Sequence, residues 1–420
     1  MAKSPFVPTG DDPVLDKVIV WLLVYLFATL PFAAIDFSLP FTVFNRSLLI
    51  IVGILSAFSA LAKRSFNVRL NGTFLILGII AIHSLISMLR AGTPDYTKEV
   101  GTFFSLVFVA IWARGVRVDV LAKAVIAVAF FYCADAIYQY FNGVDLFGFS
   151  TRNNRSWGSF YFGAPTFGIF LSFVFFLPFF YLKNWWLKLV VIAIFVSGLI
   201  VANDRAPVVQ IMLATLFFAP FRPGYRLLVI GFALTPILLV PAMDPSASNR
   251  ISSLYWGLNL FLFNRESAEF QGYLLSYGLT NYLHIWEGII DGWFRWDNLF
   301  NVLFGTGWGS SLDAARSVSA GGRPHGIHLD ILIVWGIVGY MAVFGWLIRL
   351  YWRHRETFVI LASVVLPFSF FSLTSSNYLF MMTIIYILFV AASRERQKIG
   401  AQQGTAQVGE SAAVLGQVRI

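Results

Sequence analysis

Long runs of apolar residues, separated by short polar connections, fill most of the chain. The runs are about 17 to 22 residues long, which is the length that an α-helix needs to cross the ~30 Å hydrocarbon core of a bilayer. This pattern predicts an all-α polytopic membrane protein with about twelve transmembrane helices. We expect these helices at residues 15–36, 46–62, 72–90, 99–113, 119–142, 164–182, 185–203, 206–221, 224–242, 326–348, 357–374 and 377–392.

One connection is much longer than the others. Residues 243–325 separate the ninth and tenth expected helices and form a large extracytoplasmic loop, a length that is typical of functional segments. Within it, NYLHIWEGIIDGWFRW (281–296) has apolar residues at helical spacing, which predicts an amphipathic helix on the membrane surface. The chain thus divides into helices one to nine (1–242), this loop, helices ten to twelve (326–392) and a flexible cytoplasmic tail (393–420).

Composition and charge agree with a membrane protein. The chain is 58% hydrophobic and only 12% charged, which excludes an ordinary soluble domain. Alternate short connections are rich in Lys and Arg, so by the positive-inside rule we place them, and both termini, in the cytoplasm. The net charge of +9 largely reflects this asymmetry and does not indicate a nucleic-acid partner. The single cysteine, Cys133, can form no disulfide within the chain.

Two histidines and an aspartate stand where the tenth expected helix begins. The sequence GGRPHGIHLDILIVWGIVGY (321–340) carries His325, His328 and Asp330. Ionisable groups at such a boundary are costly and often functional. A neutral imidazole can accept a proton at pH 7, so His325 is a candidate general base, although a histidine at a helix entrance can also act as a cap. His-x-x-His with one nearby acid is sparse for a metal site, and we expect no metal.

Arg205 stands in ANDRAP, between the seventh and eighth expected helices. Asn203 or Asp204 is suited to cap the next helix, and Pro207 is suited to its first turn. The free amides of that turn, together with the arginine, would then form an anion site at the membrane surface. The alternative is that Arg205 anchors the helix among lipid headgroups or pairs with Asp204.

A second outward connection, STRNNRSWGSFYFGAP (150–165), carries Arg152 and Arg155 just before the sixth expected helix. An arginine here is suited to bind an anionic group, and interfacial anchoring is the alternative. Asp135, near the outer end of the fifth helix, is placed to neutralise one of these arginines.

This layout resembles the O-antigen ligase and polymerase superfamily. The family motif is a histidine, a further residue, nine more residues, and then Gly-x-x-Gly, which His325, Gly336 and Gly339 match in spacing. NVLFGTGWGSS (301–311) is similar to a second family segment, and Arg205 in VANDRAPVV matches the family's arginine between helices seven and eight. The resemblance covers residues 150 to 345 best.

Two positions depart from the family pattern. Gly326 replaces the polar residue that usually follows the histidine. Tyr282 stands where the family tends to have a second arginine, four residues before Trp286. Arg250, Arg265 or Arg295 is the candidate to substitute for that arginine, and the sequence leaves the choice open.

The resemblance implies a metal-independent inverting glycosyltransferase. Such an enzyme moves a glycan from an undecaprenyl diphosphate carrier onto an acceptor hydroxyl at the outer face of the bacterial inner membrane. It implies His325 and Arg205 as catalytic residues, with no cofactor. The residues implied in substrate binding are Arg155, Arg250, Arg265 and His328.

Three functions remain open from the sequence. The first is an O-antigen ligase that transfers the glycan to lipid A core. The second is a polymerase of the same superfamily, which extends a growing O-antigen or exopolysaccharide on its carrier. The third is a polysaccharide transporter, which is disfavoured because the halves of the chain show no repeat and a single long outer loop carries the motif. All three would have membrane lipids as partners.

Overall fold

The part of the chain that the structure describes is mostly helical. The computed structural model describes residues 13–30, 40–62, 94–113, 116, 118–151, 155–160, 164–218, 223–243, 299–306, 327–365 and 380–397, with short segments between 256 and 291. The helices are α1 (Pro13–Thr29), α2 (Pro40–Ala62), α4 (Pro94–Trp112), α5 (Asp119–Asn142), α6 (Ala164–Val174), α7 (Leu177–Tyr181), α8 (Trp185–Ala202), α9 (Arg205–Phe218), α10 (Pro223–Met243), α14 (Leu299–Phe304), α16 (Ile327–Arg353) and α17 (Phe358–Val365). A further helix of residues 380–397, here called the C-terminal helix, follows α17.

Most of the expected helices coincide with observed ones. The match is closest for α5 and α8, which follow the expected ranges 119–142 and 185–203 to within a residue. The expected helix at 72–90 lies outside the described residues, as do 281–296 (apart from residues 290 and 291) and the tail from residue 398. The sequence pattern therefore located helices well wherever the structure describes the chain.

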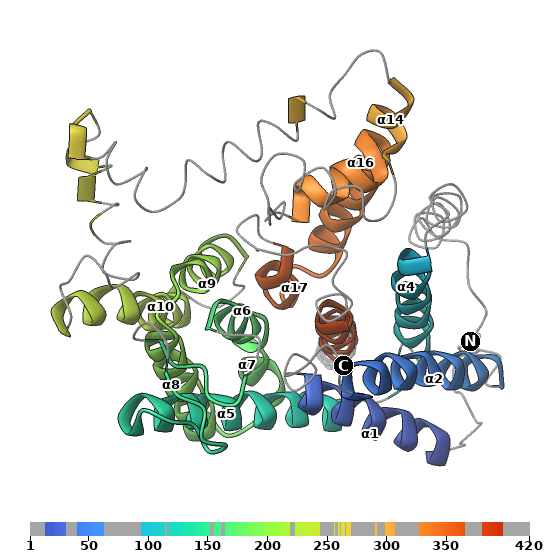
Figure 1. Ribbon diagram of the computed structural model, residues 1–420, viewed down its shortest axis with the longest axis horizontal. Coiled ribbons are helices and arrows are strands. Elements are labelled where there is room, and N and C mark those ends of the chain that lie inside the picture. Colours follow the sequence, from blue (N-terminus) through green and yellow to red (C-terminus); the bar gives the residue numbers. More distant parts are fainter. Residues whose placement is uncertain are drawn as a thin grey trace, which may run out of the picture.

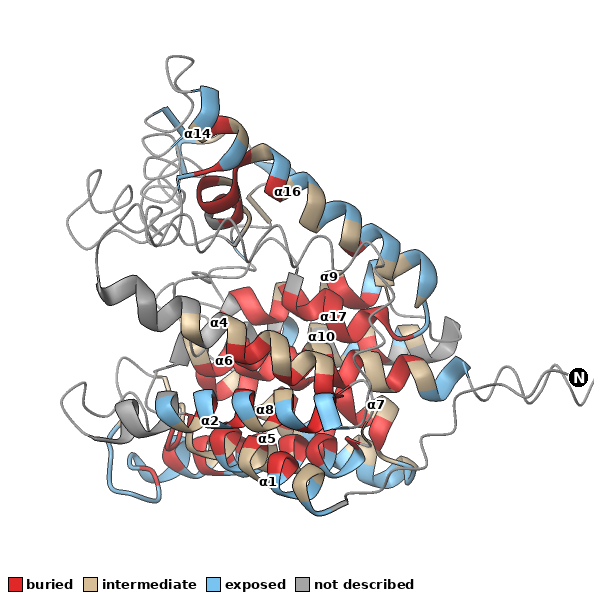
Figure 2. Ribbon diagram, turned by 90° about the vertical axis from the view of Figure 1, so that its right-hand side faces the viewer, coloured by how far each residue is buried: buried red, intermediate tan, exposed pale blue. Residues whose placement is uncertain are grey.

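Three of the described helices are long and apolar enough to cross a membrane. Two of them, Asp119–Asn142 and Trp185–Ala202, are continuous, whereas Ile331–Arg353 reaches this length only when it is counted across an interruption at Gly336. Shorter apolar helices are Ser47–Ala62, Thr166–Tyr181 and Ala206–Phe218. Figure 2 shows exposed residues along α1 and α8. Large apolar side chains are among the exposed ones, for example Trp21, Phe58, Phe131 and Trp186. Exposed apolar side chains of this kind are suited to contact lipid. The chain is therefore an α-helical membrane protein.

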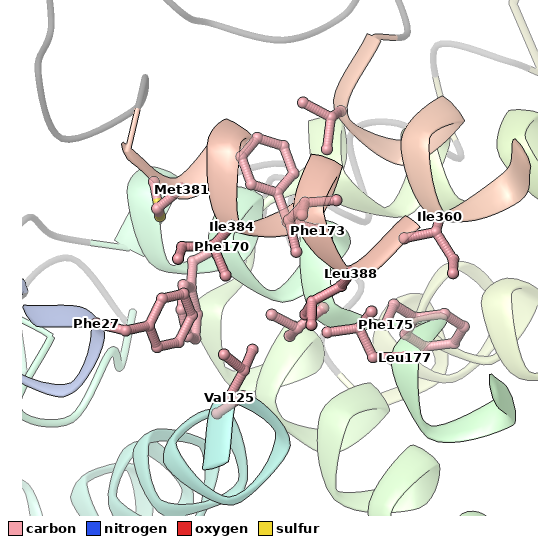
Figure 3. Packing of buried hydrophobic residues seen from close by; sticks show 14 of the residues in the cluster. Phe27, Val125, Phe170, Phe173, Phe175, Leu177, Ile360, Met381, Ile384 and Leu388 are labelled. Carbon is pink, nitrogen blue, oxygen red and sulfur yellow. The ribbon is translucent and has the colours of Figure 1, made fainter. Parts of the chain in front are cut away.

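α6 forms the centre of the bundle (Figure 1). It packs against α5, α8, α9 and α17, and every residue from 167 to 178 is buried. A helix that is apolar on all sides is suited to this position. Phe170 and Phe173 of α6 pack among side chains of the C-terminal helix, such as Ile384, which Figure 3 shows from close by. The sequence predicted one helix at 164–182. The structure has a turn at Phe175–Phe176, just before Pro178, which separates α6 from α7.

The start of α5, the end of α7 and the C-terminal helix meet at one end of the bundle. The Tyr181 hydroxyl donates to the carbonyl of Leu388 (2.5 Å) and lies near the charges of Asp119 and Glu395. Basic side chains collect there, and we call this set the basic end: Lys123, Lys183, Lys188, Arg353, Arg355, Arg394 and Arg396. Because α5 runs away from the basic end, the connection between α5 and α6 lies at the opposite end.

α16 is two helices joined by a sharp break at Gly336. This residue has φ 68° and ψ −175°, a conformation open to glycine and strained for other residues. Across the break, the His328 ring lies 5.8 Å from the Phe344 ring, centroid to centroid, whereas 16 residues of straight helix would separate them by about 24 Å. The two arms therefore fold back on each other, as a short buried arm and a long exposed one (Figure 2). This differs from the single continuous helix that was expected at 326–348.

Candidate functional site at the connection between α5 and α6

The structure describes some of the sequence-predicted site residues and leaves others outside. His325, Arg250 and Arg265 lie outside the described residues. Arg205 is described as the first residue of α9, but its side chain is not. Arg155 and His328 are described with their side chains.

Two polar side chains on the buried face of α5 hold the connection to α6. Asp135 and Gln139 are one helical turn apart and are both buried. Asp135 accepts hydrogen bonds from the backbone of Leu146 (2.9 Å) and from both the backbone (2.6 Å) and the hydroxyl of Ser159. Gln139 accepts from the N–H of Trp157 (2.9 Å) and of its neighbour Gly158. The connection is thus tied to α5 at two points.

Gly158 lets the connection approach α5 closely. Its φ is 56°, in the left-handed region that favours glycine. A Cβ at this position would lie 2.7 Å from the backbone nitrogen of Ala136 and 2.9 Å from the Asp135 carboxyl. Any larger residue would push the connection away from α5.

Arg155 joins the same connection to the turn between α8 and α9. Its Nε donates to the carbonyl of Ala202 (3.1 Å), and its guanidinium lies 3.6 Å from the carboxylate of Asp204. The backbone of Ser156 also donates to Val201 (2.9 Å), at the end of α8. Asp135 was expected to neutralise either Arg152, which lies outside the described residues, or Arg155. The structure instead pairs Arg155 with Asp204, and Asp135 binds the amides of the connection.

The turn between α8 and α9 prepares the start of α9 at Arg205. Asn203 ends α8 in the left-handed conformation (φ 49°), and Asp204 stands immediately before α9. Pro207 lies in the first turn, as the sequence predicted, and packs closely over Gly168 of α6. The first amides of a helix lack partners within the helix and carry its positive dipole end. Arg155 therefore lies beside a helix N-terminus whose first residue is Arg205.

A second contact links two segments that the sequence analysis had singled out. Gly305, at the end of α14, lies back to back with Gly336, such that a Cβ on Gly336 would come 2.5 Å from the Gly305 nitrogen. Thr306 secures this contact, because its backbone (2.8 Å) and hydroxyl (3.1 Å) both donate to the carbonyl of Ile333. Gly336 thus packs closely against α14 and the residue that follows it, which belong to the long loop between 243 and 325. α16 begins two residues after His325.

His328 lies on the short arm of α16. Its Nδ1 is 3.3 Å from the Tyr340 hydroxyl, and its ring packs against Phe344. The hairpin therefore holds this imidazole against an aromatic pair. A role for His328 in substrate binding stays a prediction.

Metal ligands are not grouped in the part of the chain that the structure describes. No three His, Cys, Asp or Glu side chains come together there in a way that could hold an ion. Gln139, Gly158 and Ser159 were not predicted as site-building residues. Their signal in the sequence is the i, i+4 pair of Asp135 and Gln139 in an otherwise apolar helix, which indicates polar partners on one face.

Comparison with models of known families and with curated proteins finds no match to this chain.

Proposed function

We propose that this chain is a metal-independent inverting glycosyltransferase of the bacterial inner membrane. It would move a glycan from an undecaprenyl diphosphate carrier onto an acceptor hydroxyl, as an O-antigen ligase acting on lipid A core. The observation that carries the proposal is the contact of the Arg155 side chain with the turn between α8 and α9, because α9 begins at Arg205. The sequence predicted both arginines to bind phosphate. They are 50 residues apart in the chain, yet both lie at the N-terminus of α9.

This arrangement suits a lipid diphosphate. A helix N-terminus attracts anions through its free amides and its dipole, and arginine forms paired hydrogen bonds to phosphate oxygens. The carboxylate of Asp204 partly neutralises the charge of Arg155. We therefore assign Arg205 the closer contact with the diphosphate. In this proposal Arg155 holds the turn in place and adds a longer-range positive charge.

The reaction needs one proton acceptor and one stabilised leaving group. A base removes the proton from the acceptor hydroxyl, whose oxygen then forms a bond to the anomeric carbon from the face opposite the carrier. The bond between that carbon and the diphosphate oxygen breaks, and undecaprenyl diphosphate departs with the electron pair. We assign the base to His325 and the stabilisation of the departing diphosphate to Arg205.

The contact between Gly305 and Gly336 supports this assignment. It fastens residues 305 and 306 of the long loop to the helix that begins just after His325. A loop fixed in this way could set the position of the histidine relative to the membrane surface. Arg250 and Arg265, which belong to the same loop, remain candidates for binding the glycan or the diphosphate.

We further propose about twelve membrane crossings with both termini in the cytoplasm. The gathering of lysines and arginines at the basic end supports this orientation, because basic residues favour the cytoplasmic side. The connection between α5 and α6 lies at the opposite end and would face outward. That is the side on which a lipid-linked glycan meets lipid A core.

The test compares purified variants for transfer of a lipid-linked oligosaccharide. Arg205→Ala and His325→Ala should each lose transfer by roughly 100-fold or more, since single catalytic donors and bases contribute about that much. Arg396→Ala is the control, because this exposed arginine lies in the C-terminal helix at the basic end, opposite the connection between α5 and α6. Full transfer by well-folded Arg205→Ala would remove the arginine from the site.

A further inference from the structure

The tip of the connection between α5 and α6 is built inside out. The tip is residues 144–149, and its one polar side chain, Asp145, is buried. Asp135 and Gln139 of α5, which bind the backbone of Leu146 and Phe149, are buried too. Its apolar side chains are exposed, with 56% of Leu146 and 58% of Phe147 accessible. A loop in water normally shows the reverse arrangement, with its polar groups outside.

Backbone N–H groups of the tip find acceptors within the protein. Every N–H from residue 145 to residue 149 donates to an acceptor within the chain. The acceptors are the carboxyl of Asp135, the carboxyl and the carbonyl of Asp145, and the carbonyl of Phe149. Irregular backbone can reach hydrocarbon depth only when such groups are paired. The tip meets this requirement for its donors.

The tip also folds back along α5 and does not extend beyond its end. The hydrogen bond from Leu146 to Asp135 brings the tip beside a residue that lies seven positions before Asn142, the last residue of α5. Seven residues of helix span about 10 Å. The tip therefore lies at the depth of the last two turns of a helix that is long and apolar enough to span a membrane.

An exposed apolar stripe on α5 leads to the tip. Phe131, Tyr138 and Phe141 are exposed at helical spacing, and Phe141 is the most exposed of them at 78%. The stripe continues into Val144, Leu146, Phe147 and Phe149, which are also exposed. The exposed side chains near the end of this helix and those of the tip are thus apolar alike.

We infer that residues 144–149 are a membrane-embedded loop that sits among the acyl chains of the adjacent leaflet. Lipid hydrocarbon covers their exposed side chains. The reasons are that these side chains are apolar, that the N–H groups of residues 145–149 are paired within the protein, and that the loop follows the exposed apolar stripe of α5. The loop anchors the end of the bundle that carries Arg155. This inference rests on membrane residence alone and stands apart from the proposed glycan transfer.

Spin labels on single cysteines test the inference in nanodiscs. Cys133 is buried, so the unmodified protein reports background labelling. A label at Phe147→Cys should collide more often with oxygen, which concentrates in hydrocarbon, than with a water-soluble nickel chelate. The matched sites are Val190→Cys, exposed in the middle of α8, and Lys183→Cys, exposed in the turn before α8.

The expected result is that the Phe147 label behaves like the Val190 label and unlike the Lys183 label. A Phe147 label that matches Lys183 would overturn the inference. Spin–spin broadening that disappears on dilution with unlabelled protein would overturn it too, because a second copy would then cover the loop. If Phe147→Cys fails to fold, Leu146→Cys carries the same test, and its outcomes are read in the same way.

Discussion

Individual glycines in the connection between α5 and α6 differ in what surrounds them. Gly158 and Gly143 both have positive φ values, of 56° and 78°. A Cβ on Gly158 would collide with Ala136 and Asp135, whereas a Cβ on Gly143 would meet nothing within 4 Å. The two sites therefore separate backbone strain from steric collision.

Gly158→Ala should destabilise the protein more than Gly143→Ala. The strain common to both costs about 1–2 kcal/mol, and the collision adds about 1–3 kcal/mol at position 158 only. Thermal unfolding of the two variants in the same detergent measures the difference. Equal losses would mean that the close approach of the connection to α5 is wrong.

Asp135 stabilises the connection through its two carboxyl oxygens. Asp135→Asn keeps the size of the side chain but turns an amide N–H₂ toward the donors of Leu146 or Ser159. A buried donor left without an acceptor costs about 1–3 kcal/mol, so we expect a loss of that order in the free energy of unfolding. Glu356→Gln, at an exposed position in the turn after α16, is the matched control and should change little. A wild-type melting temperature for Asp135→Asn would contradict the assignment.

His354 should make stability depend on pH. Burial, and then the charge of Arg353, hold the pKa of His354 below its ordinary value of 6.5. The unfolded chain therefore takes up this proton first as the pH falls, and stability is lost from about 6.5 downward until the folded pKa is reached. His354→Gln should show a smaller fall in melting temperature between about pH 7.5 and about pH 5.5. An unchanged fall would show that other groups cause it.

At the scale of elements, the apolar pattern predicted helices well but not their interruptions. α5 and α8 lie where the runs of apolar residues indicated, because membrane helices need long apolar runs. The break at Gly336 was missed, since a glycine in an apolar run reads equally well as a packing site. What forces the break is Gly305, which lies far away in sequence and docks against it. Hydrophobic periodicity carries no information about such a partner.

Gly336→Ala should open the hairpin of α16. Its Cβ would lie 2.3 Å from the carbonyl oxygen of Leu303, and its φ of 68° is strained for alanine. We expect a loss of at least about 2 kcal/mol in the free energy of unfolding. Gly345→Ala, in the long arm of α16 with nothing within 4 Å of its Cβ, should instead be neutral or stabilise the helix by up to about 1 kcal/mol. A spin-label distance between positions 328 and 344 that exceeds about 20 Å in the unmodified background would contradict the hairpin itself.

At the scale of the whole molecule, the sequence identified the ends of the bundle better than their contacts. The alternation of basic connections predicted one basic end, and the structure gathers Lys183, Arg353 and Arg396 there with their neighbours. The sequence also indicated Arg155 and Arg205 separately. It could not show that the Arg155 side chain reaches the carbonyl of Ala202, because that contact joins positions 47 residues apart.

The central claim is that the chain transfers a glycan from a lipid diphosphate without a metal. The most direct measurement is reconstitution of the purified protein with undecaprenyl diphosphate-linked oligosaccharide, with and without lipid A core, in excess chelator. The account predicts that glycan moves to the core and that undecaprenyl diphosphate is released. Longer chains that form on the carrier without core would identify a polymerase of the same chemistry. No transfer under either condition, or transfer that chelator abolishes and added cation restores, would contradict the account.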